Sequence, residues 1–105
     1  NMIRRKVRVD LSKYDSDWKD SFILLNPLSG QEVIEIQELN NTSKDSKGLI
    51  LDNYGILKNR FVSGMIYDSE SKVLRELVKE DIDSFDLEIM ADLLGAVVGD
   101  VSKKA

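Results

Sequence analysis

The sequence predicts an α+β fold in which short N-terminal antiparallel strands precede three to four helices, with the C-terminal two thirds mostly helical. Three observations support this prediction. Apolar and charged residues alternate from Val7 to Leu11, a period of two that is typical of a half-buried strand. Apolar residues recur at spacings of three and four from Leu51 to Met65, as on one side of a helix. The stretch from Leu87 to Val98 is apolar over most of its helical surface, and such a helix must be buried.

The length of 105 residues predicts one domain, which we place at residues 2–105. Its first part, residues 2–28, is expected to be strand-rich, because a second short apolar run from Phe22 to Leu25 ends before Pro27, which cannot donate to a strand ladder. Residues 29–100 are expected to be helical. The chain is therefore divided into a strand-rich start and a helical remainder.

Residues 29–40 fit two structures. Ser29 and Glu32 have the S-x-x-E spacing of a helix capping box, and Val33 and Ile36 share one helical face after it. Ile34 and Ile36 also alternate with polar residues, as they would in a hairpin. The capping box favours the helix, and the hairpin stays as the alternative.

The helix predicted from Leu51 to Met65 is followed by a polar turn at Asp68–Ser71 and by a short extended or irregular stretch. Lys79–Ser84 has the length and acidity of a single helical turn. Asp86 then caps the last helix, and Gly99 stands where a helix commonly ends.

Catalytic chemistry has few candidates in this chain. Cysteine and histidine are absent, which excludes disulfides, thiolate nucleophiles, the commonest general base and the usual zinc ligands. One acidic cluster could hold a divalent cation, but acids at helix starts are also what the helix dipole favours, and we prefer that interpretation. The cluster consists of Glu80, Asp81, Asp83, Asp86 and Glu88. We therefore predict no enzyme activity, no catalytic or metal-binding residue and no cofactor.

Charge limits the partners. The net charge of −4 and the pI near 4.8 argue against nucleic acid, since phosphate contacts need clustered Lys and Arg. The one basic cluster, at Arg4, Arg5, Lys6 and Arg8, is interpreted as the exposed side of a strand, with an arm for an acidic partner as the alternative. No apolar run approaches the roughly 18 residues that span a membrane, and no signal peptide is visible. Neither nucleic acid nor a membrane is expected as a partner.

The last helix is the main candidate for function, because its apolar surface is wider than one stripe. Leu87, Met90, Leu94 and Val97 form one ladder, and Ile89, Leu93 and Ala96 form a second beside it. Either the helix is the central core of the domain, or part of its face is left for another protein or a second copy. The residues predicted to bind a partner are Phe61, Leu87, Met90, Leu94 and Val97.

Three segments resemble the tail assembly chaperones of long-tailed bacteriophages. Pro27–Val33 (PLSGQEV) is similar to the family's helix entry. Asn59–Asp68 (NRFVSGMIYD) is similar to its helix that leads into an aspartate-containing turn. Leu77–Phe85 (LVKEDIDSF) is similar to the turn before its last helix. In the third segment Val78 stands where the family usually has Ser or Thr.

The resemblance implies a non-enzymatic protein of the bacterial host's cytoplasm. Such chaperones bind the apolar, helical tape measure protein and keep it soluble before the tail tube forms, and a longer frameshifted form often reaches the tail tube protein. A tape measure protein is thus the expected partner, with the tail tube protein and a second copy of the chain as further ones. The alternative is a small oligomeric structural or adaptor subunit of a phage or prophage particle.

Overall fold

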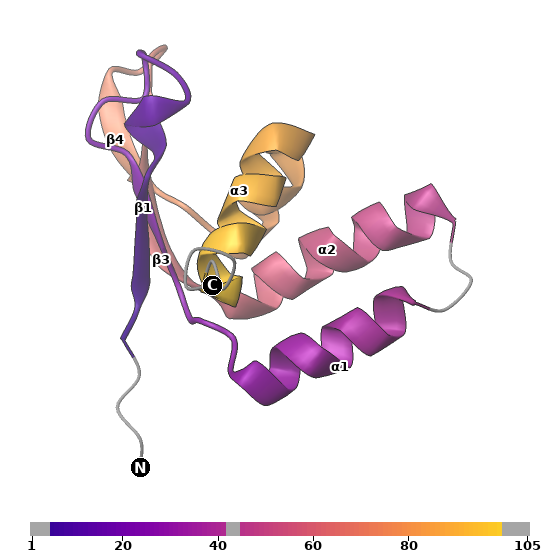
Figure 1. Ribbon diagram of the computed structural model, residues 1–105. Coiled ribbons are helices and arrows are strands. Elements are labelled where there is room, and N and C mark those ends of the chain that lie inside the picture. The colour runs from indigo at the N-terminus through magenta and orange to yellow at the C-terminus, as the bar shows by residue number, and fades with distance from the viewer. Residues whose placement is uncertain (1–4, 42–44, 100–105) are drawn as a thin grey trace.

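The computed structural model of the chain describes residues 5–41 and 45–99. Its centre is a four-stranded antiparallel sheet in the order β1-β2-β3-β4, formed by Val7–Asp10, Phe22–Leu25, Phe61–Asp68 and Val73–Glu76. Helices α1 (Gly30–Asn40) and α2 (Ser46–Arg60) lie between β2 and β3 in the sequence, and α3 (Leu87–Val98) follows β4. The three helices lie on the same side of the sheet, and α1 is the one farthest from β4 (Figure 1).

The hydrophobic core lies between the sheet and the helices α2 and α3. Every second residue of the first two strands points into it, as the two-residue period of a strand requires. The core is completed by α3, by one residue of α2 and by the segment that joins β4 to α3. The buried apolar residues are Val9, Leu11, Ile23, Leu25, Leu57, Leu77, Ile82, Phe85, Ile89, Met90, Leu93 and Val97.

The predicted fold class is wrong in the placement of strands. They are not confined to the N-terminal part, because β3 and β4 lie in the C-terminal half, inside the stretch expected to be helical. The helix predicted from Leu51 to Met65 ends at Arg60, and Phe61 has extended backbone angles (φ −64°, ψ 133°). Aromatic and β-branched residues recur along β3, at Phe61, Val62, Ile66 and Tyr67, and favour a strand there.

Gly64 gives the physical reason for a strand at this point. A Cβ atom at Gly64 would lie 2.6 Å from the carbonyl oxygen of Phe22 and 2.7 Å from Cδ1 of Leu77. The glycine allows β3 to lie close to β2 and beneath Leu77. In the sequence alone, Gly64 is compatible with a weak point in a helix, a close approach of two segments or the end of a helix.

Most of the other predicted elements are confirmed. The strand at Phe22–Leu25 is present, and the first strand ends at Asp10, because Leu11 begins a short 3-10 helix. Residues 29–40 form a helix and not a hairpin. Lys79–Ser84 is a 3-10 helix, Asp86 caps α3, and Gly99 ends it with a left-handed φ of 91°. Residues 2–4 of the predicted domain, with Arg4, and residues 100–105 lie outside the described residues.

Candidate protein-binding site

Helix α1 projects from the body of the domain at the end where β2 stops (Figure 1). Its first turn is closed by a capping box, in which the Ser29 hydroxyl accepts from the Glu32 amide and the Glu32 carboxylate accepts from the Ser29 amide. The segment before it is tied to the core by a hydrogen bond from the Leu28 amide to the Val97 carbonyl (2.8 Å). None of the α1 residues is buried.

Arg60, the last residue of α2, fixes the direction in which α1 leaves the sheet. Its guanidinium donates to the carbonyl oxygens of Asn26 (3.1 Å) and Pro27 (3.2 Å) and lies 3.6 Å from the Glu32 carboxylate. Only 14% of the Arg60 side chain is exposed, so these interactions are shielded from water. The start of α1 and the end of α2 are thereby held together.

Farther along, a groove separates the two helices. It consists of two adjoining crevices with volumes of about 390 and 230 Å³. Both are lined by Ile36, Leu39 and Ile56, and Leu51 lines the larger one. We call these four residues the α1–α2 groove.

Two of the four apolar side chains of the groove are open to solvent, whereas those of Ile36 and Ile56 are partly buried. Leu39 is 58% exposed and Leu51 is 60% exposed, and Ile34 on α1 is 51% exposed. Scattered exposed apolar residues are ordinary, but Leu39 and Leu51 line one concave surface, which is typical of a site that binds another protein. The groove offers the shape and the chemistry to receive the apolar side of a helix.

The apolar surface continues across α2 toward the start of α3. Leu51 also lines a third crevice, of about 640 Å³, together with Ile50, Tyr54 and Leu87. Leu87 is 54% exposed. One residue of the predicted binding set therefore lies on the same surface as the groove.

The other four residues of that set occupy different places. Met90 and Val97 are 6% and 0% exposed and belong to the core. Leu94 and Phe61 are partly buried and packed against the core. The structure thus brings Met90, Leu94 and Val97 together on the inner side of α3 and leaves Leu87 outside.

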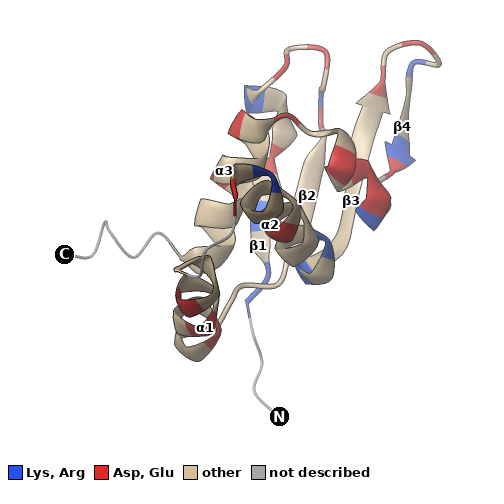
Figure 2. Cartoon of the chain, turned by 90° about the vertical axis from the view of Figure 1, so that its right-hand side faces the viewer, with Lys and Arg blue, Asp and Glu red and all other residues tan. Residues whose placement is uncertain are grey.

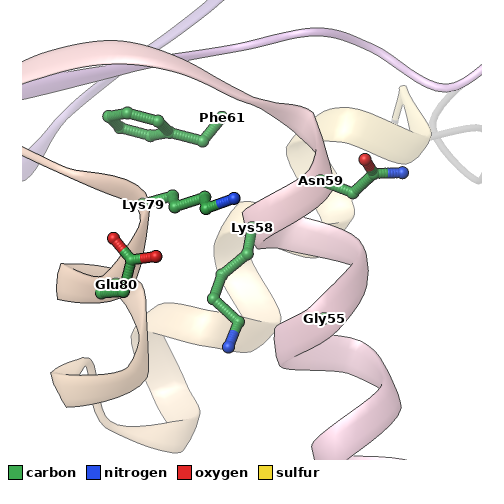
Figure 3. Close-up of a pocket in the computed structure, with 6 residues that line it drawn as sticks. All are labelled: Gly55, Lys58, Asn59, Phe61, Lys79 and Glu80. Carbon is green, nitrogen blue, oxygen red and sulfur yellow. The ribbon is translucent and has the colours of Figure 1, made fainter.

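Phe61 also lines a further crevice of about 600 Å³ with Lys58, Lys79 and Glu80, and this crevice shares Gly55 and Asn59 with the larger crevice of the groove. Figure 3 shows its ring beside the aliphatic part of Lys79, with the Lys58 side chain pointing away from it. The lining of this crevice is mainly polar, in contrast to that of the α1–α2 groove. It does not adjoin Met90 or Val97 in the described structure.

Sequence reasoning missed Ile36, Leu39, Leu51 and Ile56 as site residues. A signal was present, because apolar residues occur on several sides of α1, at Val33, Ile34, Ile36 and Leu39, in a helix only eleven residues long. A helix covered by the core on one side needs a single apolar stripe of about 100°. The surplus in α1 could have marked it as a helix with more than one apolar surface to cover.

Three of the five residues of the acidic cluster, Asp81, Asp83 and Asp86, form local caps or ion pairs. The Asp81 carboxylate accepts from the Val78 amide (2.8 Å) and from Arg75 (3.1 Å), and the hydrogen bond from Arg75 is the main cause that lowers the pKa of Asp81. Asp86 accepts from the Ile89 amide at the start of α3 (2.9 Å). Within residues 5–41 and 45–99, no group of three or more acidic side chains is placed to hold a metal ion.

Protein-family models, curated proteins and solved structures were compared with the chain, and none of them matches it. In the part of the chain that the structure describes, none of the helices has the length and apolar character needed to span a membrane.

Proposed function

We propose that the chain is a tail assembly chaperone of a long-tailed bacteriophage or prophage, a non-enzymatic protein that holds an apolar helical segment of the tape measure protein in the bacterial cytoplasm. The proposal combines the sequence resemblance with one structural observation. That observation is the α1–α2 groove, in which apolar side chains of two helices line a concave surface and two of them, Leu39 and Leu51, stay exposed.

The groove supports binding because burying its side chains would release free energy. Each Å² of apolar surface removed from water is worth roughly 25 cal/mol. The Leu39 and Leu51 side chains are more than half exposed, so a partner helix could cover most of their surface. The groove is also formed by helices, so a helical partner can place its own ridge between them.

The experiment is co-purification of the full chain with a fragment of the tape measure protein encoded in the same genome. We expect the unchanged chain to keep the fragment soluble and Leu39→Asp to lose it, because a carboxylate would be buried without a partner at the interface. Leu39 lies outside the core, so the variant should keep the melting temperature of the parent.

Val73→Asp is the matched control. Val73 is 54% exposed, close to the value for Leu39, but it lies on β4 and away from α1 (Figure 1). The Val73→Asp variant introduces the same charge as Leu39→Asp and should still bind the tape measure fragment. If Leu39→Asp binds as well as the parent, or if both variants lose binding equally, the groove is not the site.

A second function, that of a small oligomeric structural or adaptor subunit, is favoured by the uncovered face of the sheet. The helices lie on the other face of the sheet (Figure 1). On the uncovered face, the strand register places partly buried apolar side chains, those of Phe22, Leu24, Met65 and Tyr67. Leu74 is exposed beside Tyr67 on the same face. Light scattering of the chain alone tests this function. A stable oligomer that dissociates in Tyr67→Asp would support it, and a monomer at micromolar concentration would count against it.

A further inference from the structure

The α1–α2 groove has an acidic side. Helix α1 carries Glu32, Glu35 and Glu38 and no Lys or Arg between Gly30 and Asn40. In Figure 2 the charged residues of α1 are all coloured as acidic ones. Arg60 is the one cation among the described residues that line the two crevices of the groove, and it is already bonded to Glu32 and to two backbone carbonyls.

Glu35 and Glu38 add two further carboxylates on α1, and Asp52 lines the larger crevice on the α2 side. Glu35 lines the smaller crevice, and Glu38 follows it by three residues, so the two lie next to each other along the helix. Both residues are exposed. A helix that lies in the groove would pass beside Glu35, and Glu38 lies on the same helix about one turn farther along.

We propose that the groove selects an amphipathic helix of about three turns in which Lys or Arg flank the apolar stripe. This inference rests on the proposed function and specifies the chemistry of the partner. The length follows from α1, whose eleven residues extend over about 16 Å at 1.5 Å per residue. Apolar side chains at positions i, i+3 or i+4, and i+7 would enter the groove, and the basic side chains would meet Glu35 and Glu38.

The same charges disfavour the other occupants. A second copy that placed its own α1 in the groove would bring Glu35 and Glu38 against the same two residues, and like charges in contact are destabilising. Nucleic acid and anionic lipid headgroups would be repelled for the same reason. Charge complementarity thus favours a basic-flanked protein helix.

The experiment uses three synthetic peptides with one apolar stripe and with Lys, Gln or Glu at the flanking positions. Fluorescence anisotropy measures their affinity for the full chain. We expect the Lys peptide to bind about tenfold more tightly than the Glu peptide at low salt, a difference that electrostatic complementarity commonly supplies. The difference should vanish near 1 M salt, where the Debye length is about 3 Å.

A double variant tests whether these two carboxylates are responsible. Glu35→Lys with Glu38→Lys should reverse the order, so that the Glu peptide binds more tightly. The matched control is Glu70→Lys with Glu76→Lys, at the β3–β4 turn and on β4, which changes the net charge equally at exposed residues outside the groove. It should keep the preference for the Lys peptide. Circular dichroism confirms that both variants are folded.

Each outcome counts for or against the inference. Equal affinities for the three peptides, no binding of any of them, or a reversal in the control variant would overturn it. A dimer of the chain alone that Leu39→Asp dissociates would also overturn it, since a second copy would then fill the groove. The chain could also prefer the Lys peptide and yet fail to bind the tape measure fragment. That result would support the selection by charge and refute the chaperone role.

Discussion

Replacement of Gly64 by alanine distinguishes the observed strand from the helix that the sequence predicted. In a helix running to Met65, Gly64→Ala would raise the free energy of unfolding by up to about 1 kcal/mol, because alanine is the better helix former. In β3 the new Cβ atom would lie 2.6 Å from the carbonyl oxygen of Phe22 and 3.1 Å from Cα of Ile23. These are backbone atoms of the neighbouring strand and cannot rotate away.

The expected effect is a lower free energy of unfolding. Forcing one extra carbon into a filled space typically costs 1–3 kcal/mol, and we expect about 2 kcal/mol here. For a domain of this size that loss corresponds to a melting temperature about 10 °C lower. Urea denaturation followed by circular dichroism measures it, through a lower midpoint at an unchanged slope.

Gly55→Ala is the matched control, because Gly55 lies within α2 and a Cβ atom there has no neighbour within 4 Å. It should stabilise the protein by about 0.5–1 kcal/mol. If Gly64→Ala also stabilised the chain, β3 would not approach β2 and Leu77 as closely as described, and the correction to the fold class would fail.

Three further predictions test the core, the partly buried phenol of Tyr14 and the anchor of α1. In urea titrations, Met90→Ala should lower the free energy of unfolding by about 2–5 kcal/mol, and Leu87→Ala should lower it by less than about 0.5 kcal/mol. Similar losses in both variants would contradict the placement of Met90 in the core and of Leu87 on the surface. The pKa of Tyr14 is raised from 10.0 to about 12, first by burial and then by its hydrogen bond to Asp92. Because the pKa is higher in the folded state, the protonated phenol adds to the free energy of unfolding below pH 10, and this contribution is lost as the pH rises toward about 12. In Tyr14→Phe the free energy of unfolding should therefore fall less steeply over this alkaline range. If its pH profile were the same as that of the parent, the assignment would be refuted. Arg60→Ala removes charged hydrogen bonds to two carbonyls, and we expect the free energy of unfolding to fall by about 1–3 kcal/mol. Relative to the parent, amide hydrogen exchange should accelerate more in α1 than in α3, and an equal change in both helices would count against the anchor.

The sequence predicted those elements whose ends carry specific chemistry. The capping box at Ser29 and Glu32, Asp86 as the cap of α3 and Gly99 as its end were all readable, because each satisfies free backbone groups in a way that few residue types can. The third strand was not predicted, and at the fourth only a short extended or irregular stretch was expected. Phe61 and Met65 are spaced as on a helix and also fit a strand, and local spacing does not reveal that Gly64 faces a carbonyl of β2.

The candidate site was harder to predict, since an apolar residue in a sequence does not tell which side of its helix meets the core. Met90 and Val97 were assigned to a partner and lie in the core. Leu39 and Leu51 were not assigned and lie in the groove. The difference arises from long-range contacts: α3 lies against the sheet and α2, whereas α1 is held mainly at its first turn by Arg60 and the Val97 carbonyl.

Because the proposed site lies on α1 and not on α3, a substitution can affect binding without affecting folding. A substitution in the apolar ladder of Met90 and Val97 removes core contacts, so any loss of binding would be confounded with unfolding. None of the α1 side chains is buried, and its start is fixed by backbone carbonyls and a capping box, so Leu39 can change while the core stays intact. An isolated helix of eleven residues is marginal in water, and burial of its apolar side by a partner would stabilise it. Binding should therefore protect the amides of α1 from hydrogen exchange more than those of α3, whose stability already comes from the core.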